Sequence, residues 1–290
     1  MYTNGIELIA AARDRGLRIC DIVLEEEARL EELEPAVVRS RMGRVLEVMQ
    51  EAADRALDRE IRSVSGLLGG DAMRLAQYRK TATPYSGETL SLAMARALSG
   101  SEVNASMGRI CAAPTAGSCG ILPAAVITGA EAIGGDREAM IDGLLTASGI
   151  GRIVSRNATV SGAEGGCQAE CGSAAAMAAA ALVEMKGGSP EAALHAAAIA
   201  FKNILGLVCD PVAGLVEVPC AKRNAMGVAN AMTAADMALA GIQSVIPFDE
   251  VVEAMYRVGK ALPATLRETA LGGLAVTPTG LRLQKEILGR

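Results

Sequence analysis

Apolar residues recur three or four positions apart over most of this chain, which is the spacing of amphipathic α-helices. The stretch from residue 25 to residue 59 is highly charged, and Pro35 is well placed to start a helix within it. The apolar positions of this stretch are Val37, Val38, Val45, Leu46, Met49, Ala52, Ala53 and Leu57. The first 60 residues are therefore predicted to form charged helices.

The same spacing predicts further helices near residues 88–99, 136–150, 172–187, 189–205, 223–243, 247–261 and 280–288. Two boundaries carry clear signals. Ser189-Pro190-Glu191 combines a capping side chain with a proline in the first turn, and Lys186-Gly187-Gly188 is a stop signal. Alternating strand patterns are scarce, so the predicted fold class is all-α.

Glycine and proline interrupt residues 61–123. A Gly-rich loop over residues 65–72 leads into a helix, and residues 112–123 mix chain breakers with small hydroxyl side chains, which predicts a turn with closely approaching backbone. No linker clearly splits the chain. We expect a compact Ala/Gly-rich helical catalytic domain over residues 61–290. Residues 1–60 are expected to form a charged helical arm, packed on its own core or in contact with another subunit.

Composition narrows the functional classes. The chain has 290 residues, of which 51% are hydrophobic and only 2% aromatic, and its net charge is −5. Mild negative charge and few stacking side chains argue against a nucleic-acid partner. The longest Ala-rich segment, residues 173–185, is too short to span a bilayer, and the first residues lack a signal-peptide pattern. We therefore expect a cytoplasmic protein without a membrane partner, whose cysteines stay reduced.

Side chains suited to chemistry are few. The only histidine, His195, lies among alanines inside a predicted helix and is interpreted as a packed residue rather than a proton carrier. The chain has seven cysteines, an odd number that argues against a complete disulfide framework. A chain this poor in reactive groups is expected to take its reactivity from a bound group.

Three cysteines, Cys167, Cys209 and Cys220, lie at or beside the ends of predicted helices. Helix ends offer unpaired backbone N–H groups, and thiolates carried by neighbouring helices can meet at one point. Their spacing matches neither a compact zinc motif nor the compact ferredoxin motif. From spacing alone, a metal or cluster site and a set of buried small hydrophobes both remain open. The other cysteines are interpreted as structural, with Cys119 as a weaker candidate: Cys20, Cys111, Cys119 and Cys171.

Three ordered motifs resemble the α chain of bacterial iron–sulfur-dependent L-serine dehydratases, a resemblance that covers essentially the whole chain. They are A-P-T-A-G-S-C-G-I-L-P (113–123), G-A-E-G-G-C-Q-A-E-C-G-S-A (162–174) and K-N-I-L-G-L-V-C-D-P-V-A-G-L-V-E-V-P-C-A-K-R-N-A (202–225). By position, the resemblance implies that Cys167, Cys209 and Cys220 hold a [4Fe–4S] cluster and that Cys171 is not a ligand.

The resemblance also implies a partner. Single-chain members of the family carry an additional domain with a Ser-Ser-His-Thr-type motif, and some end in a cysteine-bearing tail. This sequence has neither feature. We therefore expect a two-chain enzyme in which a β subunit supplies the missing domain and L-serine is the substrate.

In the chemistry that the resemblance implies, an iron with an open position acts as a Lewis acid on the serine hydroxyl, giving pyruvate and ammonia. Pyridoxal phosphate is the other known solution, but neither Lys80 nor Lys202 has a recognisable Schiff-base context. Three alternatives remain: an L-cysteine desulfidase-like lyase, a redox or electron-transfer protein with Cys171 as a fourth ligand, and a helical scaffold with buried thiols.

Candidate substrate-binding residues lie in two Gly-containing turns and beside Cys220. Thr115, Gly117 and Ser118 form a plausible anion nest for the substrate carboxylate, although a plain turn explains them as well. Ser65, near Gly69-Gly70, is a second candidate. Arg223 and Asn224 place a cation and an amide next to Cys220, or they lie on the surface at a helix start. No catalytic base is identified from the sequence.

Overall fold

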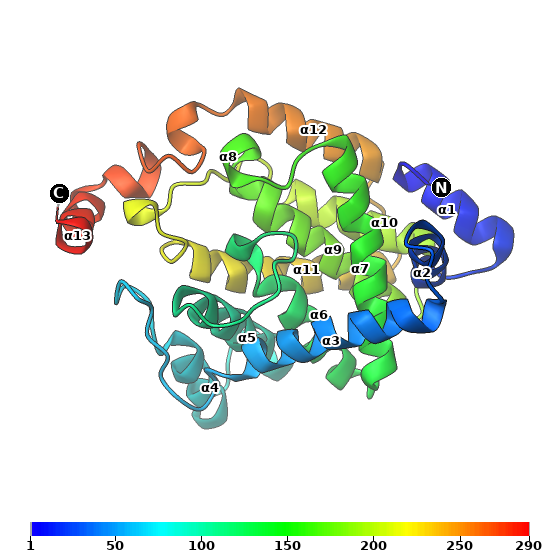
Figure 1. Ribbon diagram of the computed structural model, residues 1–290, viewed down its shortest axis with the longest axis horizontal. Helices are drawn as coiled ribbons and strands as arrows, with labels where there is room; N and C mark the ends of the chain where they lie inside the picture. Colours follow the sequence, from blue (N-terminus) through cyan, green and yellow to red (C-terminus); the bar gives the residue numbers. More distant parts are fainter. Residues whose placement is uncertain (1, 290) are drawn as a thin grey trace.

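The structure is a computed structural model that describes residues 2–289. Over these residues helices and turns make up the fold and no β-sheet forms, so the all-α prediction is confirmed (Figure 1). None of the described helices is long and apolar enough to cross a membrane. In chain order the α-helices are α1 (Gly5–Arg15), α2 (Ile19–Leu30), α3 (Pro35–Asp54), α4 (Asp71–Thr81), α5 (Gly87–Ala105), α6 (Ile121–Ala132), α7 (Arg137–Asn157), α8 (Gly162–Gly165), α9 (Ser173–Met185), α10 (Pro190–Lys202), α11 (Cys220–Leu239), α12 (Phe248–Ala261) and α13 (Pro278–Leu288).

Helix α9 lies at the centre of the molecule, in contact with α6, α7, α10 and α11 (Figure 1). Its residues from Ser173 to Glu184 are all buried, and most of them are alanines. Because alanine projects only a methyl group, neighbouring helices can approach α9 closely from every side. A helix buried all round needs almost no polar face, which accounts for its nearly uniform apolar sequence.

The first three helices share the hydrophobic core of the rest of the fold. Leu8, Ile19 and Leu46 are fully buried in it, and α2 and α3 both pack on α7. The carboxylate of Glu184 on α9 accepts hydrogen bonds from the backbone N–H groups of Ile19 and Cys20 at the start of α2, at 2.6 and 2.9 Å. The division of the chain near residue 60 into an arm and a catalytic domain stays a prediction.

Most predicted helices are present, with shifted boundaries. Helices α9, α10 and α12 lie within a few residues of the predicted ranges 172–187, 189–205 and 247–261. Helix α7 continues past the predicted end at residue 150, to Asn157. Helix α11 begins at Cys220 rather than at residue 223, so this cysteine is the first residue of the helix.

The sequence pattern does not predict α6. Its sequence, ILPAAVITGAEA, shows no 3.6-residue period because residues 121–130 are all buried among α5, α7, α9 and α11. Proline and glycine inside a short apolar run also argue against a helix. However, Pro123 lies in the first turn of α6, where its missing N–H breaks no helical hydrogen bond.

A close approach between α5 and the start of α6 fixes the turn that precedes α6. A Cβ atom added to Gly120 would lie 2.2 Å from the carbonyl oxygen of Ala97, and one added to Gly100 would lie 3.0 Å from the Cα atom of Gly120. The turn at residues 113–120 is therefore held against α5 by backbone contact, as the mixture of breakers and small residues predicts.

Replacing Gly120 by alanine should destabilise the protein by about 1–3 kcal/mol, because no side-chain rotation relieves a clash with a backbone oxygen. The free energy of unfolding in urea measures this loss. Gly135→Ala is the matched control, since the nearest atom to its added Cβ lies 3.3 Å away on the side chain of Ala139. Equal stability of the two variants would contradict the close approach.

Candidate functional site

Cys167 lies at the junction between α8 and a single π-helical turn, η2 (Gln168–Gly172), that leads directly into α9. Gly166 ends α8 with a φ of +76°, a conformation that glycine adopts without strain. Its N–H donates to the carbonyl oxygen of Gly162 at 2.9 Å. Isolated π turns are rare and frequent at functional sites. This one continues into the central helix, so Cys167 is held at the start of the buried helix α9.

The buried side chain of Gln168 ties the Cys167 turn to two other segments. Its amide nitrogen donates to the carbonyl oxygens of Gly165 and Met255, both at 2.9 Å, and its amide oxygen accepts from the N–H of Gly206 at 2.9 Å. Its own backbone N–H donates to the carbonyl oxygen of Leu207 at 3.0 Å. A fully satisfied buried amide therefore joins the turn to α12 and to the loop before Cys209.

Cys167 and Cys171 form a close sulfur pair, with 3.3 Å between their Sγ atoms. Sharing one proton with Cys171 lowers the pKa of Cys167, and the nearby guanidinium of Arg223 lowers it further. The same sharing, together with burial, raises the pKa of Cys171 well above its ordinary value. The pair thus favours a thiolate on Cys167 and a neutral thiol on Cys171, and the thiolate is the form that binds metals.

The backbone of Cys209 is pinned to the chain after α12. Its N–H donates to the carbonyl oxygen of Leu266 at 2.9 Å, and its carbonyl oxygen accepts from the N–H of Glu268 at 2.8 Å. Its Sγ atom lies 3.9 Å from a carboxylate oxygen of Glu170. Burial raises the pKa of Cys209, and the negative charge of Glu170 raises it further.

Cys220 opens α11, and Asn224 one turn later connects this helix to the Gly117–Gly120 turn. The amide nitrogen of Asn224 donates to the carbonyl oxygens of Gly117 at 2.7 Å and Cys220 at 2.9 Å. Its amide oxygen accepts from the N–H of Gly120 at 2.9 Å. Asn224 is almost fully buried, so its side chain fixes the position of two candidate segments relative to each other.

Arg223 clamps the Cys209 loop onto α11. Its guanidinium donates to the carbonyl oxygen of Val208 and to the carboxylate of Asp210, both at 2.8 Å, on the two sides of Cys209. The side chains of Arg223 and Asp210 are only 14% and 4% exposed. The other oxygen of Asp210 accepts from the N–H of Leu274 at 2.7 Å. A buried ion pair therefore joins the segments that carry Cys209 and Cys220.

The three predicted ligands lie in one neighbourhood. The charge of Cys167 contributes to raising the pKa values of both Cys209 and Cys220, and burial is the main reason that the pKa of Cys220 rises to about 12. Within residues 2–289, no three His, Cys, Asp or Glu side chains lie close enough to share one metal ion. The ligands of an iron–sulfur cluster lie farther apart than those of a single metal ion, because each thiolate binds a different iron. Three free cysteines around one spot fit that donor set.

A carboxylate that the sequence analysis did not single out lies beside these cysteines. The Oε1 atom of Glu170 accepts a hydrogen bond from the hydroxyl of Thr115 at 2.8 Å, and the oxygen of Thr115 lies 3.1 Å from the hydroxyl of Ser118. Burial raises the pKa of Glu170, whereas the bond from Thr115 lowers it. Its place three residues after Cys167, on the next helical turn, was the signal available in the sequence.

The predicted substrate-binding residues divide into two groups. Thr115, Gly117 and Ser118 lie together against Glu170, and Arg223 and Asn224 hold the neighbouring segments, as described above. Ser65 lies elsewhere, where its hydroxyl donates to the buried carboxylate of Glu217 at 2.7 Å. Among residues 2–289, no side-chain hydrogen bond joins Ser65 to the other five.

The remaining cysteines and the histidine have packing roles. Cys20 and Cys119 are buried, and burial raises the pKa of both thiols. Cys111 is half-buried near the carbonyl oxygen of Val45. The Nδ1 atom of His195 accepts a hydrogen bond from the N–H of Ser244 at 3.3 Å, as expected for a packed residue.

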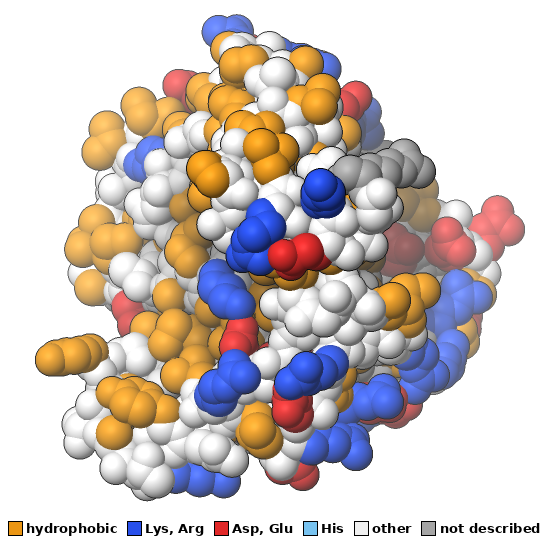
Figure 2. Space-filling model, turned by 90° about the vertical axis from the view of Figure 1, so that its left-hand side faces the viewer, with side chains coloured by type: hydrophobic (Ala, Val, Ile, Leu, Met, Phe, Trp, Pro, Cys, Tyr) orange, Lys and Arg blue, Asp and Glu red, His pale blue; other side chains and the backbone are white. Residues whose placement is uncertain are grey.

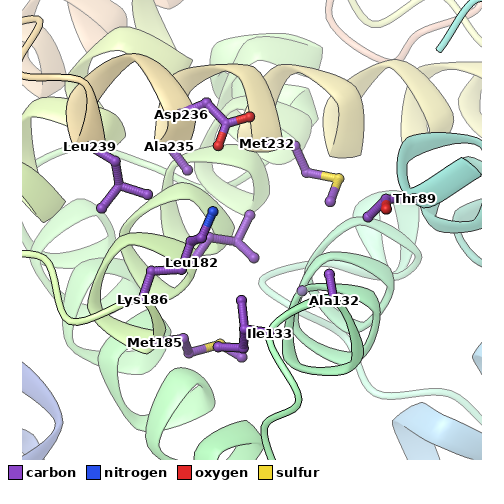
Figure 3. A pocket seen from close by; sticks show the side chains of 11 residues that line it. Thr89, Ala132, Ile133, Leu182, Met185, Lys186, Met232, Ala235, Asp236 and Leu239 are labelled. Atoms are coloured by element: carbon purple, nitrogen blue, oxygen red, sulfur yellow. The ribbon is translucent and has the colours of Figure 1, made fainter. Parts of the chain in front are cut away.

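A cavity of about 270 Å³ lies at the far ends of two helices that start at the site. Figure 3 shows it lined mainly by apolar side chains, including Leu182, Met185 and Leu239, with Lys186 and Asp236 beside them. Met185 and Leu239 are the last residues of α9 and α11. Since α9 has 13 residues, it separates this cavity from the cysteines by about 20 Å.

Comparison with known proteins identifies the family. Residues 14–275 match the family described as serine dehydratase alpha chain. The chain belongs to this family. It is 50% identical to the probable L-serine dehydratase, alpha chain, of Bacillus subtilis, over 100% of this chain and 96% of that one. It is 49% identical to the L-serine dehydratase, alpha chain, of Peptoniphilus asaccharolyticus, over 99% of each chain.

Other relatives in this family are longer. The chain is 36% identical to L-serine dehydratase 1 of Escherichia coli, and the match covers 95% of this chain but 62% of that protein. A serine dehydratase alpha chain thus corresponds to about three fifths of such a relative. The remaining part of the longer protein has no counterpart in the matched region.

Replacing Arg223 by alanine should destabilise this family member by about 3–5 kcal/mol, because it leaves the buried carboxylate of Asp210 without its cation. Urea unfolding measures the loss. Arg282→Ala is the control, since Arg282 pairs with Glu286 on the surface, where both side chains are more than half exposed, and its loss should cost less than about 1 kcal/mol. A small loss for Arg223→Ala would show that the clamp does not hold the site together.

Proposed function

We propose that the chain is the α chain of an L-serine dehydratase, a lyase that converts L-serine to pyruvate and ammonia. The observation that carries this proposal is the convergence of the Cys167, Cys209 and Cys220 segments, held together by Arg223 and Gln168, in a chain whose close relatives bear that name. Removal of the α-proton and the hydroxyl group from serine leaves an aminoacrylate, which hydrolyses to the two products.

The cofactor that we propose is a [4Fe–4S] cluster bound by Cys167, Cys209 and Cys220. When bound, it would supply a Lewis acid that eases the departure of hydroxide. The lowered pKa of Cys167 favours the thiolate that a ligand needs. Cys20, Cys111 and Cys119 have packing roles and stay outside the proposed ligand set.

The residues of the chain would bind and orient the amino acid beside the cysteines. The N–H groups of Ala116 and Gly117 have no intramolecular acceptor in the described chain, because they begin the short 3₁₀ turn η1 (Ala116–Ser118). These N–H groups are the free donors of the proposed substrate-binding turn, in which the hydroxyls of Thr115 and Ser118 pair with Glu170 and with each other. Asn224 and Arg223 would position this turn and the cysteine loops, since their own polar groups are already paired. Ser65 stays a predicted substrate residue without further support.

Two rival functions keep the same cysteines. An L-cysteine desulfidase-like lyase would release sulfide as well as ammonia, so product analysis separates it from a serine dehydratase. An electron-transfer protein would need Cys171 as a fourth ligand. Two sulfurs 3.3 Å apart do not suit two different irons of one cluster, which favours the lyase.

Free thiols and an open iron both need reducing surroundings, so we propose a cytoplasmic location.

We propose a β subunit as the partner, docked on the face that carries α13. This face exposes a set of apolar side chains, and Figure 2 shows hydrophobic side chains on it, interspersed with charged ones. A groove of about 620 Å³ runs between α13 and the loops at residues 64–67 and 215–217. The exposed residues are Val64, Leu271, Leu274, Val276, Leu281 and Leu288. Large exposed apolar surfaces mark interaction sites. The longer relatives contain sequence beyond the matched region, and this additional sequence would correspond to the β subunit.

This face borders the site. Glu217 lines the groove three residues before Cys220, and Asp210, beside Cys209, accepts from the N–H of Leu274. A β subunit seated here would cover the approach to the cysteines. The subunit contact expected along residues 1–60 stays a separate prediction.

Replacing any one of Cys167, Cys209 and Cys220 by serine should abolish pyruvate formation and lower the iron and sulfide content of the anaerobically purified two-chain protein, because three thiolates hold the cluster. Iron, sulfide and pyruvate assays with L-serine measure both effects. Cys111→Ser should leave all three values unchanged. Wild-type protein that makes pyruvate without iron would overturn the proposal. A wild type that binds iron but makes no pyruvate, and that loses its iron in Cys171→Ala, would favour the electron-transfer rival.

Replacing Leu281 by aspartate should weaken binding of the β subunit at least about tenfold, since it buries a charge in an apolar interface. Leu281 is 52% exposed, so the α chain should still fold, as circular dichroism can check. Ile6→Asp is the control, because Ile6 is 69% exposed on α1, at the opposite side of the molecule from α13 (Figure 1). Titration of labelled α chain with β chain measures both affinities, and a larger loss for Ile6→Asp would move the interface to the N-terminal helices.

A further inference from the structure

Glu170 is a largely buried carboxylate enclosed by the candidate site. A Cβ atom added to Gly117 would lie 3.0 Å from its Oε1 atom, and one added to Gly162 would lie 2.6 Å from its Oε2 atom. The missing side chains of two glycines therefore make the space that the carboxylate occupies. The thiol of Cys209 lies beside its second oxygen.

A chain of hydroxyl groups orients this carboxylate. The single proton of the Thr115 hydroxyl is used in the 2.8 Å bond to Glu170, so the oxygen of Thr115 can only accept from the Ser118 hydroxyl, 3.1 Å away, which also lies 3.4 Å from the carbonyl oxygen of Thr115. Ser118 is fully buried. The direction of these bonds, from Ser118 to Thr115 to Glu170, stabilises the ionised form of the carboxylate.

No cation of the described chain pairs with Glu170. No lysine or arginine between residues 2 and 289 lies within ion-pair distance of it. Two arginines on neighbouring segments bind other groups, Arg223 the carboxylate of Asp210 and Arg267 the carbonyl oxygen of Glu164. Glu268 adds a second negative charge nearby. A cationic group bound from outside the chain would compensate this largely buried carboxylate.

We propose that Glu170 binds the α-ammonium group of the amino-acid substrate. The inference rests on the proposed function and adds the group that distinguishes an amino acid from a hydroxy acid or a carboxylic acid of the same size. The ammonium group offers three N–H donors, and Glu170 has free acceptor positions beside the cysteine loops. A site built around a charged hydrogen-bond acceptor strongly rejects an analogue that lacks the donor.

The direct test uses the anaerobically prepared two-chain enzyme and two ligands that lack the leaving hydroxyl, L-alanine and propionate. They differ in the ammonium group, and neither turns over, so calorimetric titration measures binding alone. Glu170→Gln should raise the dissociation constant of L-alanine about tenfold to hundredfold, because it removes a charge-assisted hydrogen bond. The dissociation constant of propionate should not rise.

Three comparisons make the result specific. Iron and sulfide content should match the wild type, which excludes a damaged cluster. Glu164→Gln removes an exposed carboxylate from the same segment and should change neither ligand. Thr115→Val removes the orienting hydroxyl and should shift L-alanine binding in the same direction as Glu170→Gln, by a smaller factor. Glu170→Asp keeps the charge and should retain the preference for L-alanine if Glu170→Gln fails to fold.

The outcomes separate this inference from the proposed function. Equal weakening of both ligands in Glu170→Gln, with an active wild type, overturns the ammonium site and leaves the dehydratase standing. Suppose that the wild type binds L-alanine more tightly than propionate, that Glu170→Gln removes this preference, and that no pyruvate forms from L-serine. This result would support the ammonium site and overturn the dehydratase proposal. A wild type that binds L-alanine no better than propionate overturns the ammonium site, whatever its activity.

Discussion

The buried ion pair between Arg223 and Asp210 is the interaction on which the candidate site depends. Cys209 lies in an irregular loop, and a loop cysteine has no fixed position unless something holds the residues on both sides of it. Arg223 does this by binding the Val208 carbonyl oxygen and the Asp210 carboxylate from the first turn of α11. Breaking such a pair is costly because it strands a charge away from water. The pair therefore fixes the geometry of the Cys209 loop relative to the start of α11.

Around this pair, buried polar side chains hold the turns and loops of the site in place through directed hydrogen bonds, which apolar packing does not provide. Gln168 fixes the Cys167 turn to α12 and to the loop at residue 206, and Asn224 fixes the Gly117–Gly120 turn to α11. Behind them, the alanine-rich helix α9 lets its neighbours come close enough for these short side chains to reach. Small core residues allow the helices to pack closely. Because of this close packing, the loops lie within hydrogen-bonding range of the buried amide side chains at the helix ends.

Much of this architecture could be predicted from local sequence signals, and the remainder depends on tertiary contacts. Capping and breaker residues located α10 and the end of α9 because those signals act over a few residues. Helix α6 was not predicted because it is buried on every side. It therefore has no polar face, and its sequence lacks the 3.6-residue hydrophobic period of an amphipathic helix. The cysteine motifs predicted the region of the site. The spacing of Glu170 from Cys167 was a local signal, but its bond from Thr115 and the pairing of Arg223 with Asp210 were not predictable, because these tertiary hydrogen bonds leave no local pattern.

The distribution of the cysteines over separate elements constrains how the protein matures. Cys167 precedes α9, Cys209 follows α10 and Cys220 opens α11, so a newly made chain has no pocket for an inorganic centre until these helices have assembled. Cys167 and Cys209 are buried in the finished fold, whereas Cys220 is half-buried. On the proposed function, iron and sulfide would have to reach the cysteines after these helices have assembled, and Cys220 is the most accessible of the three.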